Sequence, residues 1–358
     1  MSEYISIPKK IQFELSSMCN ALCLGCVRTD SKNFNISKAF IAKKQLVEVE
    51  TVVKLLSDDL MKTVELVEFC GTIDEPLMHP RFFDIIKELY KINPQYNIII
   101  HTNASIRGKE EWAELAGLLQ KFKHHRVSFS IDGLSDTHEL YRQKTSYEKI
   151  IENAQAFIDA GGNAAWQFLV FPWNKHQVEE ARAISSAMRF RDFIVRHDRS
   201  IVSNLGLDKI VELKNKDNRS GNNDSTTIEQ LLESYQNINS IEIECFNKNE
   251  GMYFVSYDSR LWPCCFVPNG FLQQRQVSVD FLTQRLYNQY GEDFNDLTEH
   301  SVSDIVNGDF FKNDLVESWS NPVSTAKCGK ITRCAETCNV QKLKALPIGK
   351  HKILRNSQ

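Results

Sequence analysis

The sequence predicts an α/β fold in which a mostly parallel sheet curves into an incomplete barrel, followed by a smaller C-terminal domain. Short apolar runs alternate with longer amphipathic runs through the first half of the chain, which is the pattern of βα units. Six such units within about 200 residues suit an incomplete barrel better than a closed eight-stranded one. A polar, turn-rich stretch at 213–225 then precedes shorter strand patterns, which indicates a second domain.

Each predicted strand is a short apolar run bounded by polar or turn residues. The six strands of the first half are expected at 11–15, 64–70, 97–102, 127–131, 166–171 and 193–196. Amphipathic helices are expected between them at 45–62, 80–92, 109–122, 146–160 and 177–188. Ligands of such sheets bind where the strands end, because the loops there are free to vary. The polar residues that follow the strands are therefore the candidate site.

The domain boundaries follow from the same patterns. We expect the barrel at 1–205, a linker at 206–235 and the smaller domain at 236–345. Within the smaller domain, strands are expected at 241–244 and 252–257. The basic end of the chain, 346–358, has few core residues and is expected to be a docking or frayed tail.

Composition excludes several classes of function. Hydrophobic residues make up 42% and charged residues 25%, so the chain can bury a sizeable core. Lysine and arginine number 43 and aspartate and glutamate 46, for a net charge of −3, which argues against a protein that coats nucleic acid or an anionic membrane. The N-terminus lacks the apolar stretch of a signal peptide, and no apolar run could span a bilayer, so we expect a cytoplasmic protein. There, ten cysteines indicate metal sites rather than disulfides.

The first cysteine cluster has the spacing C-x3-C-x2-C and follows the first predicted strand. It consists of Cys19, Cys23 and Cys26. Three thiolates can hold three irons of a four-iron cluster and leave the fourth iron open to a substrate, whereas four would make a closed electron carrier. The alternative is a zinc knuckle, but zinc needs a fourth ligand, and neither Cys nor His occurs in the next thirty residues.

This segment, ELSSMCNALCLGCVR, resembles the signature of the radical S-adenosylmethionine (SAM) superfamily. The resemblance covers roughly 11–199 and implies a partial (β/α)6 TIM-like barrel. It also implies that Cys19, Cys23 and Cys26 hold a [4Fe–4S] cluster and that SAM chelates its fourth iron. In this family an electron from the cluster cleaves SAM to methionine and a 5′-deoxyadenosyl radical, which abstracts hydrogen from substrate. One departure is Gly25, where the family usually has an aromatic residue near adenine.

Later strand ends extend the resemblance through CGTIDEPL, HTNAS and SFSIDGL, followed by Tyr141-Arg142. The positions that match SAM-binding residues of the family are Asp74, Glu75, Thr102, Asn103, Ser130, Asp132 and Arg142. The acidic pair is expected to accept the SAM ammonium, and the arginine fork to pair with the SAM carboxylate. Asp74 replaces the family's usual glycine. Gln167 and Asn174 are further candidates for ribose or substrate contacts.

Each of these positions also has a simpler interpretation. Glu75 could cap the following helix, Asp132-Gly133 could be an ordinary turn, and Arg142 could be a surface arginine. Cys70, within the second predicted strand, is expected to be a buried apolar thiol rather than a ligand.

The second cysteine cluster resembles the SPASM and twitch domains that follow many radical SAM barrels. YDSRLWPCC matches their D-G-x-V-x-P-C hairpin, with Ser259 in the place of glycine and Cys265 as a non-ligating neighbour. The candidate ligands are Cys245, Cys264, Cys328, Cys334 and Cys338. Five cysteines suffice for one four-iron cluster but not two, so the pattern is that of a twitch (SPASM-like) domain with one auxiliary [4Fe–4S] cluster. A four-cysteine zinc site is the alternative.

The resemblance implies an oxidoreductase-type enzyme that uses SAM, two [4Fe–4S] clusters and an electron donor such as a flavodoxin or ferredoxin. Its substrate is unidentified. A first strand near residue 11 leaves no room for the N-terminal recognition domain of many peptide maturases. We therefore expect oxidation or epimerisation of a small molecule or carbohydrate, with a peptide-modifying maturase as the alternative. From another class, a non-catalytic iron–sulfur or zinc protein is disfavoured, because an electron carrier needs no SAM pocket. A membrane or nucleic-acid partner is not expected.

Overall fold

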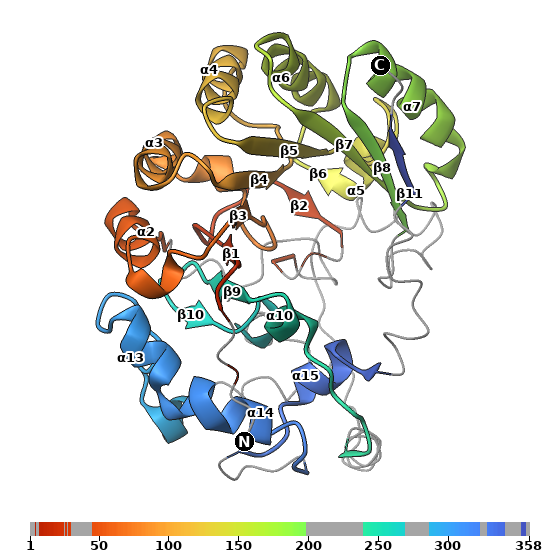
Figure 1. The fold of residues 1–358 in the computed structure, drawn as a ribbon. Coiled ribbons are helices and arrows are strands. Elements are labelled where there is room, and N and C mark those ends of the chain that lie inside the picture. The colour runs from red at the N-terminus through yellow and green to blue at the C-terminus, as the bar shows by residue number, and fades with distance from the viewer. Residues whose placement is uncertain are drawn as a thin grey trace, which may run out of the picture. The chain divides into compact units, whose positions relative to one another are not determined.

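The computed structural model describes residues 4, 7–24, 26, 28–29, 45–197, 239–268, 286–322, 328–340 and 352–355 (Figure 1). The chain forms two compact units. The barrel unit comprises Phe13–Val53, Glu65–Arg219 and His351–Gln358. The C-terminal unit comprises Ser220–Lys350 together with Met1–Gln12 and Lys54–Val64. The linker predicted at 206–235 lies outside the described residues.

The barrel unit is built on a parallel sheet. Its parallel strands are β3 (Leu66–Phe69), β4 (Asn97–Thr102), β5 (His124–Ser130), β7 (Ala164–Val170) and β8 (Asp192–His197). Between or beside them run α3 (Phe82–Ile92), α4 (Lys109–Leu119), α5 (His138–Tyr141), α6 (Tyr147–Asp159) and α7 (Val178–Ala187). Strand β1 (Lys10–Phe13) ends beside β3, since Cys70 N donates to Phe13 O at 3.2 Å. The predicted α/β fold with a parallel sheet is confirmed.

The two faces of this sheet differ in polarity. One face packs against the helices (Figure 1), where the Phe129 ring lies 5.2 Å from Trp112 of α4 and 5.7 Å from Phe157 of α6, between ring centroids. Sheets of βα units are usually apolar on both faces because helices cover both. Here the opposite face carries charged and polar side chains, among them Glu68 and His101. A polar face turned away from the helices is the wall that an open barrel presents to its ligands.

Several elements differ from expectation. Strands β2 (Leu22–Cys23) and β6 (Arg142–Gln143) form a short antiparallel pair that no sequence pattern indicated. Within the range 45–62, expected to be one helix, α2 covers only Val49–Leu56. Within the basic segment expected to be a tail, β11 (Lys352–Arg355) pairs antiparallel with the edge strand β8. Pairing with an open sheet edge satisfies backbone groups that would otherwise face water.

The C-terminal unit contains a β-hairpin and several short helices. The hairpin consists of β9 (Met252–Val255) and β10 (Leu261–Trp262). The helices of this unit include η1 (Asp59–Met61), α10 (Phe246–Asn249), α13 (Val302–Asn307), η5 (Phe310–Asp314), α14 (Leu315–Glu317) and α15 (Thr332–Thr337). The strand expected at 241–244 is reduced to one bridge, Ile243 to Asn339. Ser259 adopts φ 63° in the hairpin turn, so it takes the left-handed conformation for which the family uses glycine.

No helix among the described residues is long and apolar enough to cross a membrane.

Candidate functional site

The loop that carries the first three cysteines is fixed in place by backbone pairing. Cys23 lies opposite Arg142 in the β2–β6 pair, and Leu24 N donates to Tyr141 O at 3.2 Å. Cys26 N donates to Cys23 O at 3.2 Å, which closes a turn between the second and third cysteines. The loop is thus joined to the segment after β5, where the sequence predicted a SAM-binding arginine.

The environment of these thiols suits thiolates that are bound to a metal. Burial raises the pKa of the Cys23 thiol to about 12 and also raises the pKa values of Cys19 and Cys26. Buried thiolates therefore need positive charge nearby, which iron would provide. Two N–H donors already point at the sulfurs: Asn103 Nδ2 lies 3.6 Å from Cys19 Sγ, and Arg142 Nη1 lies 3.7 Å from Cys23 Sγ. Such donors are typical of iron–sulfur ligands, so these residues fit a cluster.

Asp132 and Arg142 form a buried ion pair beside Cys23. Arg142 Nε donates to Asp132 Oδ2 at 2.6 Å, and the side chains are 16% and 1% exposed. The other carboxylate oxygen, Asp132 Oδ1, accepts from Leu169 N at 2.8 Å. Arg142 is therefore not a surface arginine, and Asp132 does more than form a turn. The pair holds the guanidinium against the cysteine loop.

Glu75 links the ends of β3 and β4. Its Oε1 accepts from Thr102 Oγ1 at 2.6 Å and its Oε2 from Asn103 N at 2.7 Å. Burial raises the pKa of the Glu75 carboxyl to about 7, although these two hydrogen bonds act to lower it. Glu75 precedes the short helix η2 (Pro76–Met78), but its side chain makes no capping hydrogen bond. The carboxylate therefore faces the site rather than capping a helix.

Asp74 points the other way, toward the start of the cysteine loop. Its Oδ2 accepts from Leu15 N at 2.9 Å and from Ser16 N at 3.2 Å. Burial raises the pKa of Asp74, and the neighbouring carboxyl of Glu14 raises it further. Burial raises the pKa of the Glu14 carboxyl as well. Asp74 therefore braces the loop backbone in this structure, and its expected contact with the SAM ammonium stays a prediction.

The predicted residues thus meet around the cysteine loop, and the family match agrees with that geometry. Residues 13–183 match the model of the radical SAM superfamily. The barrel of this chain is a radical SAM domain. A four-iron cluster and SAM are the cofactors that this superfamily implies.

Solved structures share the fold of this chain at low sequence identity. A structure of anSMEcpe with bound AdoMet is 14% identical, with a TM-score of 0.52 over 86% of this chain and 80% of that one. Streptococcus suis SuiB bound to its precursor peptide SuiA is 16% identical, with a TM-score of 0.50 over 76% of this chain. The chain spans 62% of the length of that SuiB chain. No curated protein sequence matches the chain.

Two residues of the radical SAM domain were missed by sequence reasoning. Glu14, at the end of β1, accepts from Ile73 N and Asp74 N through Oε1. Arg28 is only 4% exposed and donates to the backbone oxygens of Cys19 and Ser17. A charged residue two positions after the last cysteine was the available signal for Arg28. No sequence signal marked Glu14, because its hydrogen-bond partners lie 59 or more residues away along the chain.

The weaker candidates divide into two kinds. Asn174 is fully buried, and its amide bonds to the backbone of Phe171, Asp132 and Leu169. It therefore shapes the loop after β7. Ser130 and Gln167 are register partners on β5 and β7. Both lie on the polar face of the radical SAM sheet, where a ligand would meet them.

A second site lies in the C-terminal unit, where four cysteines come together. Cys245, Cys264, Cys334 and Cys338 are each at most 9% exposed. The thiols of Cys245 and Cys338 are neighbours: the contact lowers the pKa of Cys245 and raises that of Cys338. Burial raises the pKa of Cys264 to about 12 and raises that of Cys334, which Cys264 and Cys245 raise further. Lys248 N donates to Cys245 Sγ at 3.4 Å. Four buried thiols with amide donors fit a metal that replaces their protons.

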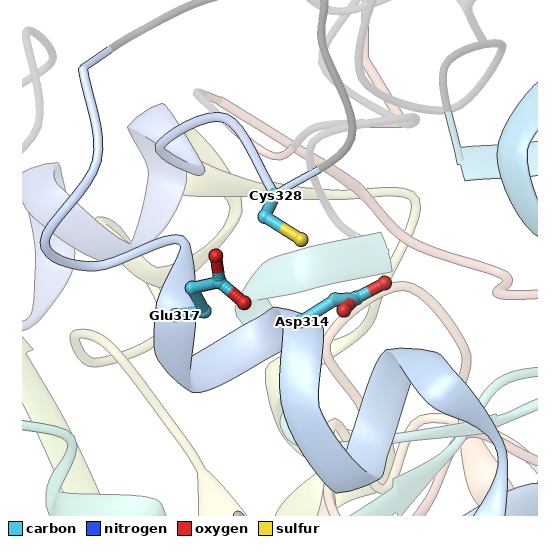
Figure 2. Close-up of side chains that lie close together, drawn as sticks. All are labelled: Asp314, Glu317 and Cys328. Carbon is cyan, nitrogen blue, oxygen red and sulfur yellow. The ribbon is translucent and has the colours of Figure 1, made fainter. Parts of the chain in front are cut away.

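Cys328 lies beside two carboxylates rather than beside the other four cysteines of this unit. Its sulfur and the carboxylate oxygens of Asp314 and Glu317 all lie within 4.8 Å of one another, as Figure 2 shows. Asp314 also accepts from Tyr290 Oη at 2.7 Å. The sequence left open which of Cys328, Cys334 and Cys338 would be ligands. The structure groups the last two with Cys245 and Cys264 and turns Cys328 toward two carboxylates.

Proposed function

We propose that the chain is a radical SAM enzyme in which Cys19, Cys23 and Cys26 hold the four-iron cluster and the neighbouring strand ends bind SAM. The observation that carries the proposal is the pair of N–H contacts from Asn103 and Arg142 to the sulfurs of Cys19 and Cys23. These donors come from the end of β4 and the start of β6, which supports a single site made of the cysteine loop and the matched SAM-binding positions. An electron carrier would not need that arrangement.

When bound, the cluster supplies the electron that cleaves SAM into methionine and the radical that abstracts hydrogen. The chain binds and orients SAM. Glu75 accepts the SAM ammonium, because each of its oxygens keeps a lone pair after its present hydrogen bond. Arg142 faces the SAM carboxylate, with Asp132 fixing its orientation. Thr102 and Asn103 hold Glu75 in place.

Asp74, Ser130 and Asp132 complete the proposed SAM site. Asp74 acts through the loop backbone that it braces, and Ser130 lines the polar face at the end of β5. Both carboxylate oxygens of Asp132 accept from protein donors, Oδ2 from Arg142 Nε and Oδ1 from Leu169 N.

The C-terminal unit is proposed to bind one auxiliary four-iron cluster through Cys245, Cys264, Cys334 and Cys338. A cluster with four protein thiolates has no iron open to SAM, so its proposed task is to relay an electron or to brace the unit. The electron that cleaves SAM is proposed to come from a flavodoxin or ferredoxin. The favoured substrate is a small molecule or carbohydrate, and a peptide is the alternative.

The direct test is SAM cleavage without substrate. Reconstituted anaerobically and given dithionite and SAM, the wild-type protein is expected to release 5′-deoxyadenosine slowly, because this chemistry belongs to the cofactor. Chromatography of the quenched reaction measures the product. If the protein carries its full iron but releases no 5′-deoxyadenosine with dithionite, titanium citrate or reduced flavodoxin, the proposal is contradicted and an electron carrier is favoured.

SAM affinity should depend on pH through Glu75. Since burial raises the pKa of Glu75 to about 7, the carboxylate that accepts the ammonium is lost as the pH falls below that value. Affinity should then fall by up to about tenfold per pH unit. Equilibrium dialysis of SAM between about pH 6 and about pH 8.5 measures it. Glu75→Gln should bind SAM more weakly and without this dependence. The amine of SAM titrates equally with both proteins, so their affinity ratio isolates Glu75. A ratio that stays constant with pH would exclude this role.

A further inference from the structure

The polar face of the barrel sheet carries two arginines that the SAM site does not use. Arg126 lies on β5 and Arg196 on β8. Alternate residues of a strand share a face, so Arg126 lies on the same face as Ser128 and Ser130. The register continues this face from Ser130 to Gln167 on β7.

The face extends to β8, because Leu169 follows Gln167 by two residues and pairs with Arg196. On the other side, Ser128 pairs with His101 of β4, and Arg126 with Ile99. Strands β4 to β8 therefore present one continuous face, on which these polar residues lie among apolar ones such as Ile99, Leu169 and Ile194. The intervening residues, such as Phe129, pack on the helices instead.

Polar atoms on this face are buried without partners. Among the described residues, Arg126 Nε, Arg196 Nε, Ser128 Oγ and Gln167 Oε1 are inaccessible to solvent and make no hydrogen bond. Buried polar groups are normally paired, because an unmade hydrogen bond costs about 1–3 kcal/mol and more for a charged group. Four such atoms on one face indicate that something complementary is missing from it.

The charge of the missing partner follows from the two guanidinium groups. Burial lowers the pKa of Arg196, and the positive charge of Arg126 lowers it further, so the two cations lie near enough to repel. Glu68 offsets part of this charge, but its carboxylate is already paired with His101 Nε2 at 2.8 Å. Asp192 shares this face of β8 but lies four residues before Arg196. The charges that act on Arg196 are therefore those of Arg126 and Glu68, and beside these two guanidinium groups an anion would compensate the positive charge that Glu68 leaves.

We propose that this face binds an anionic group of the substrate, a carboxylate or a phosphate, between Arg126 and Arg196. Two planar guanidinium forks match the oxygens of either group. The inference deepens the proposed function, since it assigns the substrate class of the same barrel. Arg126 stands four residues before Ser130, or about 13 Å along the strand. Arg196 lies level with Leu169, two residues beyond the level of Ser130 and Gln167. The anion therefore lies between the lower part of β5 and the strand ends, on the face that also carries Ser130 and Gln167.

The test is anion binding to the full-length, iron-loaded protein by equilibrium dialysis. Radiolabelled inorganic phosphate and succinate are the two probes, measured separately. The wild-type protein should bind about one equivalent of at least one probe, and the better probe identifies the source as phosphate or carboxylate. Arg126→Gln and Arg196→Gln should each weaken this binding by about tenfold to a hundredfold. Arg126→Lys, which keeps the charge, should bind more tightly than Arg126→Gln.

Arg191→Gln is the matched control, because Arg191 is exposed just before the same strand β8; it should bind the probe as wild type does. Iron content reports on folding in every variant. The inference is overturned if neither probe binds in a saturable way, or if the glutamine variants bind as tightly as Arg191→Gln. A protein that binds the anion but never cleaves SAM would refute the proposed function instead, whereas one that cleaves SAM and binds neither probe would refute only the anion site.

Discussion

Alanine at Cys19, Cys23 and Cys26 together should halve the iron that the protein binds and abolish its cleavage of SAM. Two four-iron clusters predict about eight irons per chain after anaerobic reconstitution, and about four should remain in the triple variant. The four buried cysteines of the C-terminal unit are untouched by the change, so their iron should stay. Iron and zinc are measured by elemental analysis, and 5′-deoxyadenosine by chromatography.

Cys70→Ala provides the control for this experiment. Cys70 is partly buried rather than fully buried as expected, and its thiol donates to Phe13 O at 3.4 Å. It lies near the site in sequence yet belongs to neither group of candidate ligands, so its removal should leave about eight irons. Stoichiometric zinc with little iron in the wild-type protein would contradict the two-cluster interpretation and restore the zinc alternative.

The apolar runs of the sequence were enough to predict the parallel strands but not the short strands β2 and β6. Strand β4 has the bounds expected from its apolar run, Asn97–Thr102, because the residues that signal it also fill the core. Strands β2 and β6 have two residues each, which is too few to show the alternation of apolar and polar residues that predicts a strand. They exist because the cysteine loop pairs with the segment around Arg142, a contact between residues 119 positions apart.

In the candidate site, too, the sequence identified the residues but not which partners they contact. Glu75, Thr102 and Asn103 were selected from separate strand ends, and the structure joins them through hydrogen bonds. Asp74 was expected beside the SAM ammonium with Glu75, yet its carboxyl bonds to the backbone of Leu15 and Ser16. Adjacent residues in an extended segment point in opposite directions, so these neighbouring acids serve different partners. A motif match could not tell which acid faces the loop.

Which cysteines come together at the second cluster depends still more on tertiary packing. The spacing of Cys328, Cys334 and Cys338 permits any two of them to be ligands. Only the helix α15, which carries Cys334 and is followed directly by Cys338, brings that pair to one place; Cys338 N donates to Cys334 O at 2.7 Å. Cys328 lies before the helix with φ 61° and faces Asp314 and Glu317.

Cys264→Ala should remove the auxiliary iron, whereas Cys265→Ala and Cys328→Ala should keep it. Cys264 is 6% exposed among the three other buried thiols, and losing one of four thiolates would leave a cluster iron without its protein ligand. About four irons should be lost and about four retained. The free energy of unfolding of the C-terminal unit should also fall, because metal ligation contributes directly to folding. Iron analysis measures the first effect, and the rate of limited proteolysis the second.

The two controls test separate parts of this ligand set. Cys265 is the sequence neighbour and is only partly buried, so iron loss from Cys265→Ala with retention in Cys264→Ala would place the hairpin ligand one residue later. Cys328 tests the choice among the last three cysteines. Beside two carboxylates its thiolate would be repelled rather than stabilised, so Cys328→Ala should keep about eight irons. If Cys328→Ala loses the auxiliary iron while Cys338→Ala retains it, then Cys328 is a ligand in place of Cys338, and the grouping of four buried thiols is not the cluster site.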